Sequence, residues 1–155
     1  CLGMQSAVIE YSRNVLKLKN ADSTEMNTNT KYPVIDLMEN QKNLNEKGGT
    51  MRLGAYKCKL VNKSIAKTAY KKNNIFERHR HRFELNNKYK TKLEKAGMLA
   101  TGINEKNNLV EIIEIPSHRW FLGVQFHPEY KSTVSQPHPL FINFIDACLK
   151  YKSNG

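Results

Sequence analysis

The chain has 155 residues, 39% of them hydrophobic, which is enough for one globular domain with its own core. Its net charge of +11 would suit a nucleic-acid-binding protein, but the lysines are scattered instead of concentrated in one run, so we expect no nucleic-acid partner. The three cysteines, at positions 1, 58 and 148, lack the spacing of a metal site or a disulfide scaffold. No apolar run approaches the roughly 20 residues of a membrane-spanning helix. We therefore expect a cytoplasmic protein without a membrane partner.

The first fifteen residues predict an amphipathic helix that begins at a cysteine. Apolar side chains recur at spacings of three and four, at Met4, Val8, Tyr11 and Val15. The unpaired N–H groups and the dipole at the start of a helix favour negative charge, so they would stabilise a thiolate at Cys1 and bind an oxyanion beside it. Gly3 leaves the first turn bare, which lets a substrate approach the backbone. Cys1 is therefore a candidate nucleophile.

The next part of the chain predicts strands joined by a loop and a short helix. Residues 32–35 and 51–61 are typical of strands, and the second should be half-buried with Cys58 in the core. Between them, residues 38–50 show no periodicity and indicate an exposed loop. Ser64 can cap the short helix that follows it.

Arginine and histidine alternate within residues 76–85. In a strand, the arginines would share one face and the histidines the other. We expect Arg78 and Arg80 to form ion pairs on the sheet surface. We expect His79 and His81 to pack or hydrogen-bond, because no partners are spaced for a metal site.

The remaining segments complete an alternation of strands and helices. Residues 88–96 predict a helix that ends at Gly97, and 98–103 and 109–115 predict two strands. Residues 120–126 are almost continuously apolar, which is typical of a strand buried on both faces. This mixture of elements indicates an α/β fold.

A last helix should begin at Pro139 and pack by one apolar stripe. The stripe consists of Leu140, Phe141, Phe144, Ile145, Cys148 and Tyr151.

The tripeptide His127-Pro128-Glu129 follows the apolar run and is a second candidate site. Pro128 favours an extended backbone at His127, and in an extended segment residues two apart point the same way. Glu129 can therefore fix the tautomer of His127 and stabilise the imidazolium that forms when His127 takes a proton. Together with Cys1 these residues make a nucleophile, a base and a group that orients the base.

Two of these stretches resemble the class I, triad-type glutamine amidotransferases. Residues 1–5 (Cys-Leu-Gly-Met-Gln) resemble their nucleophile elbow, and residues 125–129 (Gln-Phe-His-Pro-Glu) resemble their His-Glu box. Three more stretches, at 20–25, 48–54 and 77–82, look like the glutaminase domain of the CTP synthase family. The resemblance implies a flavodoxin-like α/β fold with an open, mostly parallel sheet flanked by helices, of which this chain would be the C-terminal portion.

The resemblance also implies a glutaminase. Cys1 would attack the side-chain amide of L-glutamine with the help of His127 and Glu129, ammonia would leave, and water would release glutamate from the thioester. The positions carried over for glutamine binding are Leu2, Gly3, Met4, Gln5, Glu25 and Arg82. Their chemistry agrees, because a site for a free amino acid should offer one anion to the ammonium group and one guanidinium to the carboxylate.

Further expectations concern the longer proteins of this family. In them, the ammonia passes to an ATP- and Mg²⁺-dependent synthase domain that aminates UTP to CTP, a C–N bond-forming ligase reaction, and GTP is an allosteric activator. We expect no cofactor or metal in this segment and a homotetramer held through the synthase domain. The family's glutaminase domain also has a segment before the cysteine that donates part of the oxyanion hole, and we expect that missing segment to lie beside this one.

Three alternatives remain open. Cys1 could act as an N-terminal nucleophile with its own amino group as base, as in class II amidotransferases, although that mechanism needs no His-Glu box. The chain could be a non-catalytic, amidotransferase-like regulatory module. It could also be a γ-glutamyl hydrolase of the same fold, although the Gly-Gly-Thr-Met-Arg-Leu-Gly and Arg-His-Arg-His-Arg stretches favour the synthase.

Overall fold

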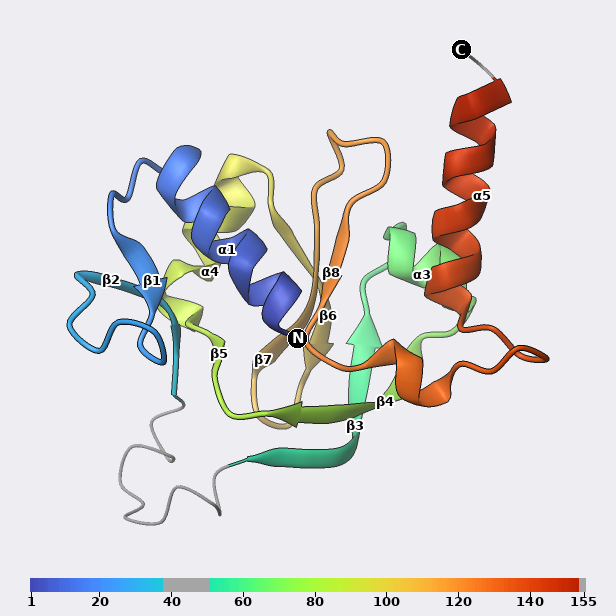
Figure 1. The fold of residues 1–155 in the computed structure, drawn as a ribbon, viewed down its shortest axis with the longest axis horizontal. Helices are drawn as coiled ribbons and strands as arrows, with labels where there is room; N and C mark the ends of the chain where they lie inside the picture. The colour runs from blue at the N-terminus through green and yellow to red at the C-terminus, as the bar shows by residue number, and fades with distance from the viewer. Residues whose placement is uncertain (38–50, 154–155) are drawn as a thin grey trace.

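Short helices and strands alternate along the chain and form a mixed α/β fold (Figure 1). The computed structural model describes residues 1–37 and 51–153, so the loop predicted at 38–50 lies outside the described residues. The helices are α1 (Leu2–Asn14), α3 (Ile65–Tyr70), α4 (Asn87–Ala96) and α5 (Pro139–Ser153), with a 3₁₀ helix η2 (Pro128–Lys131). The strands are β1 (Ala21–Ser23), β2 (Tyr32–Asp36), β3 (Arg52–Leu60), β4 (Asn74–His81), β5 (Glu84–Leu85), β6 (Leu99–Asn104), β7 (Leu109–Glu114) and β8 (Leu122–Val124).

The strands form two sheets. The larger has the order β4-β3-β6-β7-β8 with antiparallel pairings throughout, and the smaller has the order β1-β2-β5 with one parallel pair, β1 and β2. The α/β class is therefore confirmed, but the expected predominance of parallel strands is not found in the described residues. The connections explain this, because β6–β7 and β7–β8 are joined by 105–108 and 115–121, shorter than the dozen or so residues of a parallel crossover.

Helix α1 packs on the smaller sheet and on β8, which places its first residue beside the end of β8 (Figure 1). Its buried side chains Met4, Val8 and Ile9 join a core cluster with buried residues of β1, β2, β5 and β7. The predicted stripe is thus confirmed at Met4, Val8 and the partly buried Tyr11, whereas Val15 follows the end of the helix and is exposed. A second cluster lies between the larger sheet, α3 and the first turn of α5, and it contains Cys58 as predicted.

The predicted ends of two helices are also confirmed. The side chain of Ser64 accepts a hydrogen bond from the backbone N–H of Lys67 at 3.0 Å at the start of α3. Gly97 ends α4 with a left-handed backbone (φ +108°), which glycine adopts without steric cost.

Two predictions near the C-terminus are wrong. Of the apolar run 120–126, only the three residues of β8 pair, they are half-buried, and β8 pairs with β7 alone, so it is not a strand buried on both faces. In α5 only Leu140 of the predicted stripe is buried, and Cys148 is exposed. The cause is the position of α5, which packs on α3 near its start and then extends away from both sheets (Figure 1). Within the described ranges, no helix is long and apolar enough to span a membrane.

Candidate active site

Cys1 is the N-cap residue of α1 and is held against β8. Its backbone nitrogen donates to the carbonyl oxygen of Val124 at 2.5 Å, and its own carbonyl accepts from the backbone N–H of Gln5 at 3.2 Å. The side chain of Cys1 is partly exposed, and a Cβ added at Gly3 would meet nothing within 4 Å. The surface over the first turn of α1 is therefore open beside the sulfur, and the helix directs its unpaired N–H groups there.

His127 and Glu129 form the hydrogen-bonded pair that the sequence predicts. His127 Nδ1 lies 2.6 Å from Glu129 Oε1, and the backbone N–H of His127 donates to the carbonyl of Arg78 on β4 at 2.9 Å. Because a carboxylate only accepts, Nδ1 carries the proton and Nε2 is the basic nitrogen. Nε2 is buried and has no hydrogen-bond partner in the structure. The imidazole is thus oriented by Glu129 and stacked on Tyr130 at 5.0 Å, with its basic nitrogen unengaged.

The carboxylate of Glu129 stays ionised in this position. Its partial burial would raise its pKa, but hydrogen bonds from its own backbone N–H and from His127 outweigh that effect and lower the pKa below its ordinary value. An ionised Glu129 can stabilise the imidazolium that forms when His127 takes a proton.

Gln125 connects Cys1 with His127 and was not predicted as a separate functional residue. It is fully buried, its backbone N–H donates to the carbonyl of Glu111 on β7 at 2.9 Å, and its Nε2 lies 3.7 Å from Cys1 Sγ. His127 follows two residues later with an extended backbone (φ −111°, ψ 91°), so both side chains leave the chain on the same side. No direct hydrogen bond joins Cys1 to His127, both of which are described, but the sulfur contacts the segment that carries the base.

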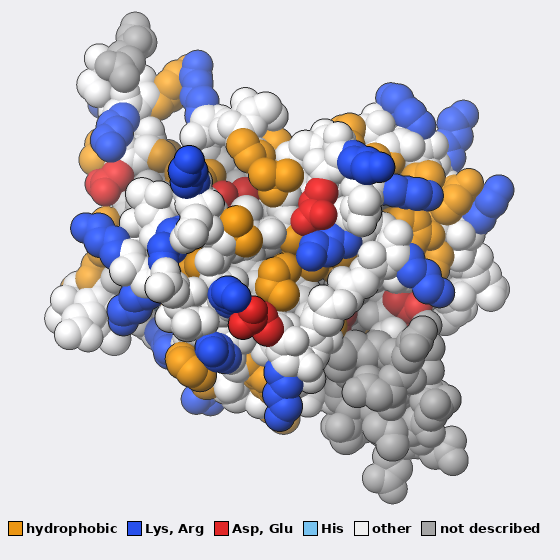
Figure 2. Space-filling model, turned by 180° about the vertical axis from the view of Figure 1, so that it is seen from behind, with side chains coloured by type: hydrophobic (Ala, Val, Ile, Leu, Met, Phe, Trp, Pro, Cys, Tyr) orange, Lys and Arg blue, Asp and Glu red, His pale blue; other side chains and the backbone are white. Residues whose placement is uncertain are grey.

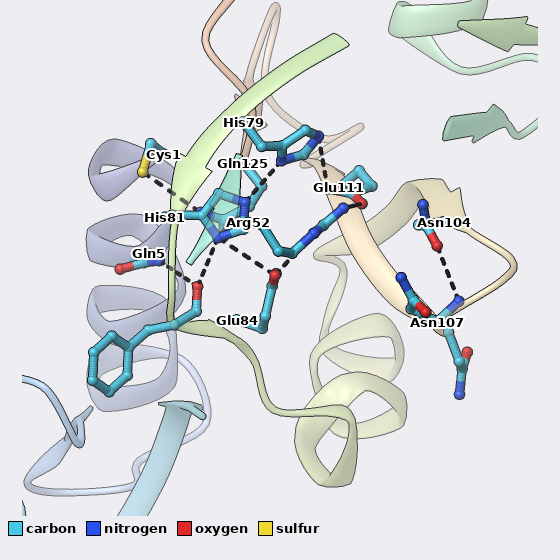
Figure 3. A network of polar contacts seen from close by, with 12 residues as sticks. Cys1, Gln5, Arg52, His79, His81, Glu84, Asn104, Asn107, Glu111 and Gln125 are labelled. Carbon is cyan, nitrogen blue, oxygen red and sulfur yellow. Dashed lines mark hydrogen bonds and ion pairs between the residues drawn. The ribbon is translucent and has the colours of Figure 1, made fainter. Parts of the chain in front are cut away.

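A buried ionic cluster lies behind this segment (Figure 3). Arg52 is 4% exposed and binds Glu84 Oε1 through Nη1 at 2.8 Å and Glu111 Oε1 through Nη2 at 2.7 Å. Burial opposes the charge on Arg52, but the two carboxylates outweigh burial and raise its pKa. Burial also raises the pKa of Glu111, and it raises that of Glu84 to about 8 despite the attraction of Arg52. One cation therefore serves two buried carboxyl groups.

His79 and His81 extend this cluster toward α1 (Figure 3). His79 Nδ1 lies 2.8 Å from His81 Nε2, and His81 Nδ1 lies 3.2 Å from the carbonyl oxygen of Phe83, which also accepts from Gln5 Nε2 at 3.0 Å. Burial, and then the charge of Arg52, lower the pKa of His79 to about 2 and that of His81 to about 3, so both rings are neutral. Their predicted hydrogen-bonding role is confirmed, and the chain of contacts fixes Gln5 four residues after Cys1.

The two charged residues expected to bind glutamine lie on different connections. Glu25 is exposed between β1 and β2, and its backbone N–H donates to Ser23 Oγ at 3.2 Å. Arg82 lies between β4 and β5, beside Phe83, and its Nε is buried without a hydrogen-bond partner. Arg82 thus precedes the residue that binds Gln5, whereas in the described part of the chain no hydrogen bond or ion pair joins Glu25 to the other site residues.

The remaining charged residues of the described part show neither the ion pairs expected at Arg78 and Arg80 nor a metal site. Arg78 and Arg80 are exposed on β4, and neither forms an ion pair with another residue of 1–37 or 51–153, so the predicted ion pairs are not found among these residues. Lys and Arg side chains are spread over the face shown in Figure 2 among apolar and acidic ones. Within the described part of the chain, no group of three or more His, Cys, Asp or Glu side chains could hold a metal ion.

Comparison with known proteins identifies similar chains over the whole site. Residues 1–147 match the family model described as glutamine amidotransferase class-I. The CTP synthase of Christiangramia forsetii is 65% identical over 147 residues, which are 95% of this chain and 27% of that protein. The CTP synthase of Aquifex aeolicus is 53% identical over 152 residues, 98% of this chain and 29% of that protein. The chain thus spans little more than a quarter of the length of these relatives.

A solved structure shows the same fold. The glutaminase domain of CTPS from Trypanosoma brucei, with bound acivicin, matches with a TM-score of 0.89 and 41% sequence identity. The match covers 96% of this chain and 58% of that one.

Proposed function

Because the chain belongs to the class-I glutamine amidotransferase family, we propose that its residues hydrolyse the side-chain amide of L-glutamine through a thioester on Cys1. The observation that carries this proposal is the state of His127: Glu129 holds Nδ1 at 2.6 Å, while Nε2 is buried and has no hydrogen-bond partner among the described residues. A base prepared in this way, on a segment that contacts the cysteine sulfur, is what nucleophilic catalysis requires.

The steps follow from these positions. His127 Nε2 takes the proton of the Cys1 thiol, and the sulfur attacks the amide carbon of glutamine. As the C–N bond breaks, the imidazolium gives its proton to the leaving ammonia. His127 then takes a proton from water, which attacks the thioester, and the proton returns to the departing sulfur as glutamate leaves.

We assign the binding of glutamine to the first turn of α1 and to two charged residues. Leu2, Gly3 and Met4 offer backbone beside the sulfur, and Gln5 is held in place by Phe83. Arg82 would bind the α-carboxylate, for which its buried, unpartnered Nε is suited, and Glu25 would bind the ammonium group.

In the intact protein, we propose that the ammonia serves a glutamine-hydrolysing CTP synthase. The support is the identity of 53–65% to proteins of that name, of which this chain spans 27–29%. ATP with Mg²⁺, which would neutralise its phosphate charge, and the amination of UTP would then belong to the part of the longer protein that these residues do not cover. GTP activation, a homotetramer and a cytoplasmic location are parts of the same proposal.

The proposal is tested by labelling the intact protein with a diazo ketone that mimics glutamine, followed by peptide mapping. We expect one adduct on Cys1, abolished by an excess of glutamine. Folded protein without an adduct on Cys1 would overturn the glutaminase assignment and would favour a non-catalytic module.

A variant of the base separates the proposal from the class II alternative. His127→Ala should lower glutamine hydrolysis by about 10²–10⁴-fold, because general base catalysis contributes that much. His118→Ala, at an exposed histidine outside the site, is the matched control and should leave the rate unchanged. If His127→Ala retains most of the activity, a base other than His127 serves Cys1. Hydrolysis of γ-glutamyl peptides in preference to glutamine would instead favour the hydrolase alternative.

A further inference from the structure

Among the described residues, Gln125 has a side-chain polar group that contacts the sulfur of Cys1. Its Nε2 lies 3.7 Å from Sγ, a separation at which an N–H group can donate to sulfur, and the side chain is completely buried. Its backbone is fixed by the carbonyl of Glu111 at 2.9 Å, and the preceding residue, Val124, accepts from the backbone nitrogen of Cys1 at 2.5 Å. The contact is thus held from both sides, by β7 and by the start of α1.

The amide of Gln125 differs chemically from the imidazole of His127. An amide N–H does not titrate, so it can donate a hydrogen bond to the sulfur in every step of the reaction. While His127 removes a proton, its Nε2 is an acceptor, and it can donate to the sulfur only after it has become an imidazolium. The amide of Gln125 needs no such proton transfer, so it would stabilise the thiolate both as it forms and as it leaves the thioester.

We propose that Gln125 is a catalytic residue of this site, whose side-chain amide donates to the Cys1 thiolate both when the thiolate forms and when it leaves the thioester. This inference rests on the glutaminase function proposed above. It adds a second, permanent donor to the proton-transferring pair of His127 and Glu129. The unpartnered Oε1 of Gln125 is consistent with the assignment, because the buried amide turns its donor, and not its acceptor, toward the sulfur.

The test measures the thiolate of Cys1 directly, without turnover. Gln125→Met keeps the length of the side chain but removes the donor, and Gln125→Glu keeps its shape but replaces the donor by an acceptor. Alkylation of Cys1 by iodoacetamide is followed against pH in the intact protein, and the rate is read from the peptide that carries Cys1. This reading excludes Cys148, which is exposed, and Cys58, which is fully buried and whose pKa is raised by burial.

We expect alkylation at pH 7 to be about tenfold slower in Gln125→Met, because hydrogen bonds to charged groups are worth roughly that factor or more. The midpoint of the pH–rate curve should move to higher pH in Gln125→Met and further in Gln125→Glu, while the rates at high pH converge. In glutamine hydrolysis, kcat should fall with little change in KM. Gln136→Met, at an exposed glutamine in the loop before α5, is the matched control and should give the unaltered curve.

The outcomes are separable. If either folded Gln125 variant gives a pH–rate curve that overlays that of the unaltered protein, the inference is overturned even though glutamine is hydrolysed. If the curves shift as expected but the unaltered protein does not hydrolyse glutamine, Gln125 still stabilises the thiolate and only the proposed function fails. Because Gln125→Glu has nearly the same volume as the original residue, it provides the test should the methionine variant not fold.

Discussion

Replacing Arg52 by methionine should destabilise the larger sheet more than the same replacement at an exposed arginine would. Arg52 is 4% exposed, and it is bound to Glu84 (2% exposed) and to Glu111 (0%). Methionine keeps much of the apolar stem, but it removes the guanidinium, whose carbon lies 4.4 Å from the centre of the Tyr56 ring, and leaves the two carboxyl groups without a cation. Breaking a buried ion pair in this way costs about 3–5 kcal/mol.

The expected cost also depends on pH. In the variant, Glu111 avoids being a buried, unpaired charge by taking a proton, and holding a proton at a pH above the ordinary value of 4.5 costs about 1.4 kcal/mol per pH unit. The cost should therefore be at most about 3 kcal/mol at pH 7 and smaller at pH 5.5, because the raised pKa of Glu111 means that the unaltered protein already bears part of this protonation cost. Glu84 adds less to the cost of the replacement, because burial already raises the pKa of Glu84 to about 8 when Arg52 is present.

The assay is amide hydrogen exchange of β3 and β4 in the intact protein, which reports the local free energy of opening. Arg80→Met is the matched control, because Arg80 lies on the exposed face of β4 opposite Leu53. A difference between Arg52→Met and Arg80→Met below about 1 kcal/mol at pH 7, or one that is the same at pH 5.5, would refute the reasoning.

Two further predictions concern packing and protonation in the same sheet. Gly102→Ala should lower the free energy of opening of β6, measured by hydrogen exchange, by about 1–3 kcal/mol, because the new Cβ would lie 2.5 Å from Ile112 Cγ1 and 2.8 Å from Cys58 Sγ. Gly3→Ala is the control, because a Cβ there meets nothing within 4 Å. Equal effects of the two replacements would contradict the packing argument. The second prediction concerns His79, which takes a proton near pH 6.5 in the unfolded chain but only near pH 2 in the folded one. Between pH 6.5 and 4.5, the free energy of unfolding of the unaltered protein should therefore fall by about 1.4 kcal/mol per pH unit more than that of a His79→Gln variant. Thermal melts of the two proteins across this range test the second prediction, and parallel pH profiles would show that His79 is protonated in the folded state.

The sequence predicted those parts of the fold in which one face of an element is buried. Helix α1 and strands β3 and β4 were recognisable because their exposed and buried residues alternate with the period of the element. The His127–Glu129 pair was predictable for a similar reason, since an extended backbone places residues two apart on one side.

Other features depend on contacts that no local pattern contains. The strand β1 is three residues long and polar, and it exists because it pairs with β2. The burial of Arg52 could not be read from the alternation of β3, because its two acidic partners come from β5 and β7. The antiparallel order of the larger sheet likewise depends on pairings between distant segments, and only its two short connections, 105–108 and 115–121, are local features that agree with it.

Gln125 and Cys148 show that the surroundings of a side chain cannot be read from its local sequence alone. Gln125 was seen only as part of a motif, because a glutamine in an apolar run gives no sign of which atom it will face; its contact with Cys1 spans 124 residues. Cys148 was expected in the core from its helical spacing, yet it is exposed, and Leu140 in the first turn is the buried residue that α5 contributes among those described.

The distance along the chain between Cys1 and Gln125 has a consequence for protein synthesis. The nucleophile leaves the ribosome first, and the segment that contacts its sulfur follows 124 residues later. At about 5–20 residues per second, this delay is roughly 6–25 s. During that time the nascent chain carries the cysteine but not the residues proposed to activate it, and β8 must join β7 before the two meet. On the function proposed above, glutamine hydrolysis can therefore begin only after residues 125–129 have been made.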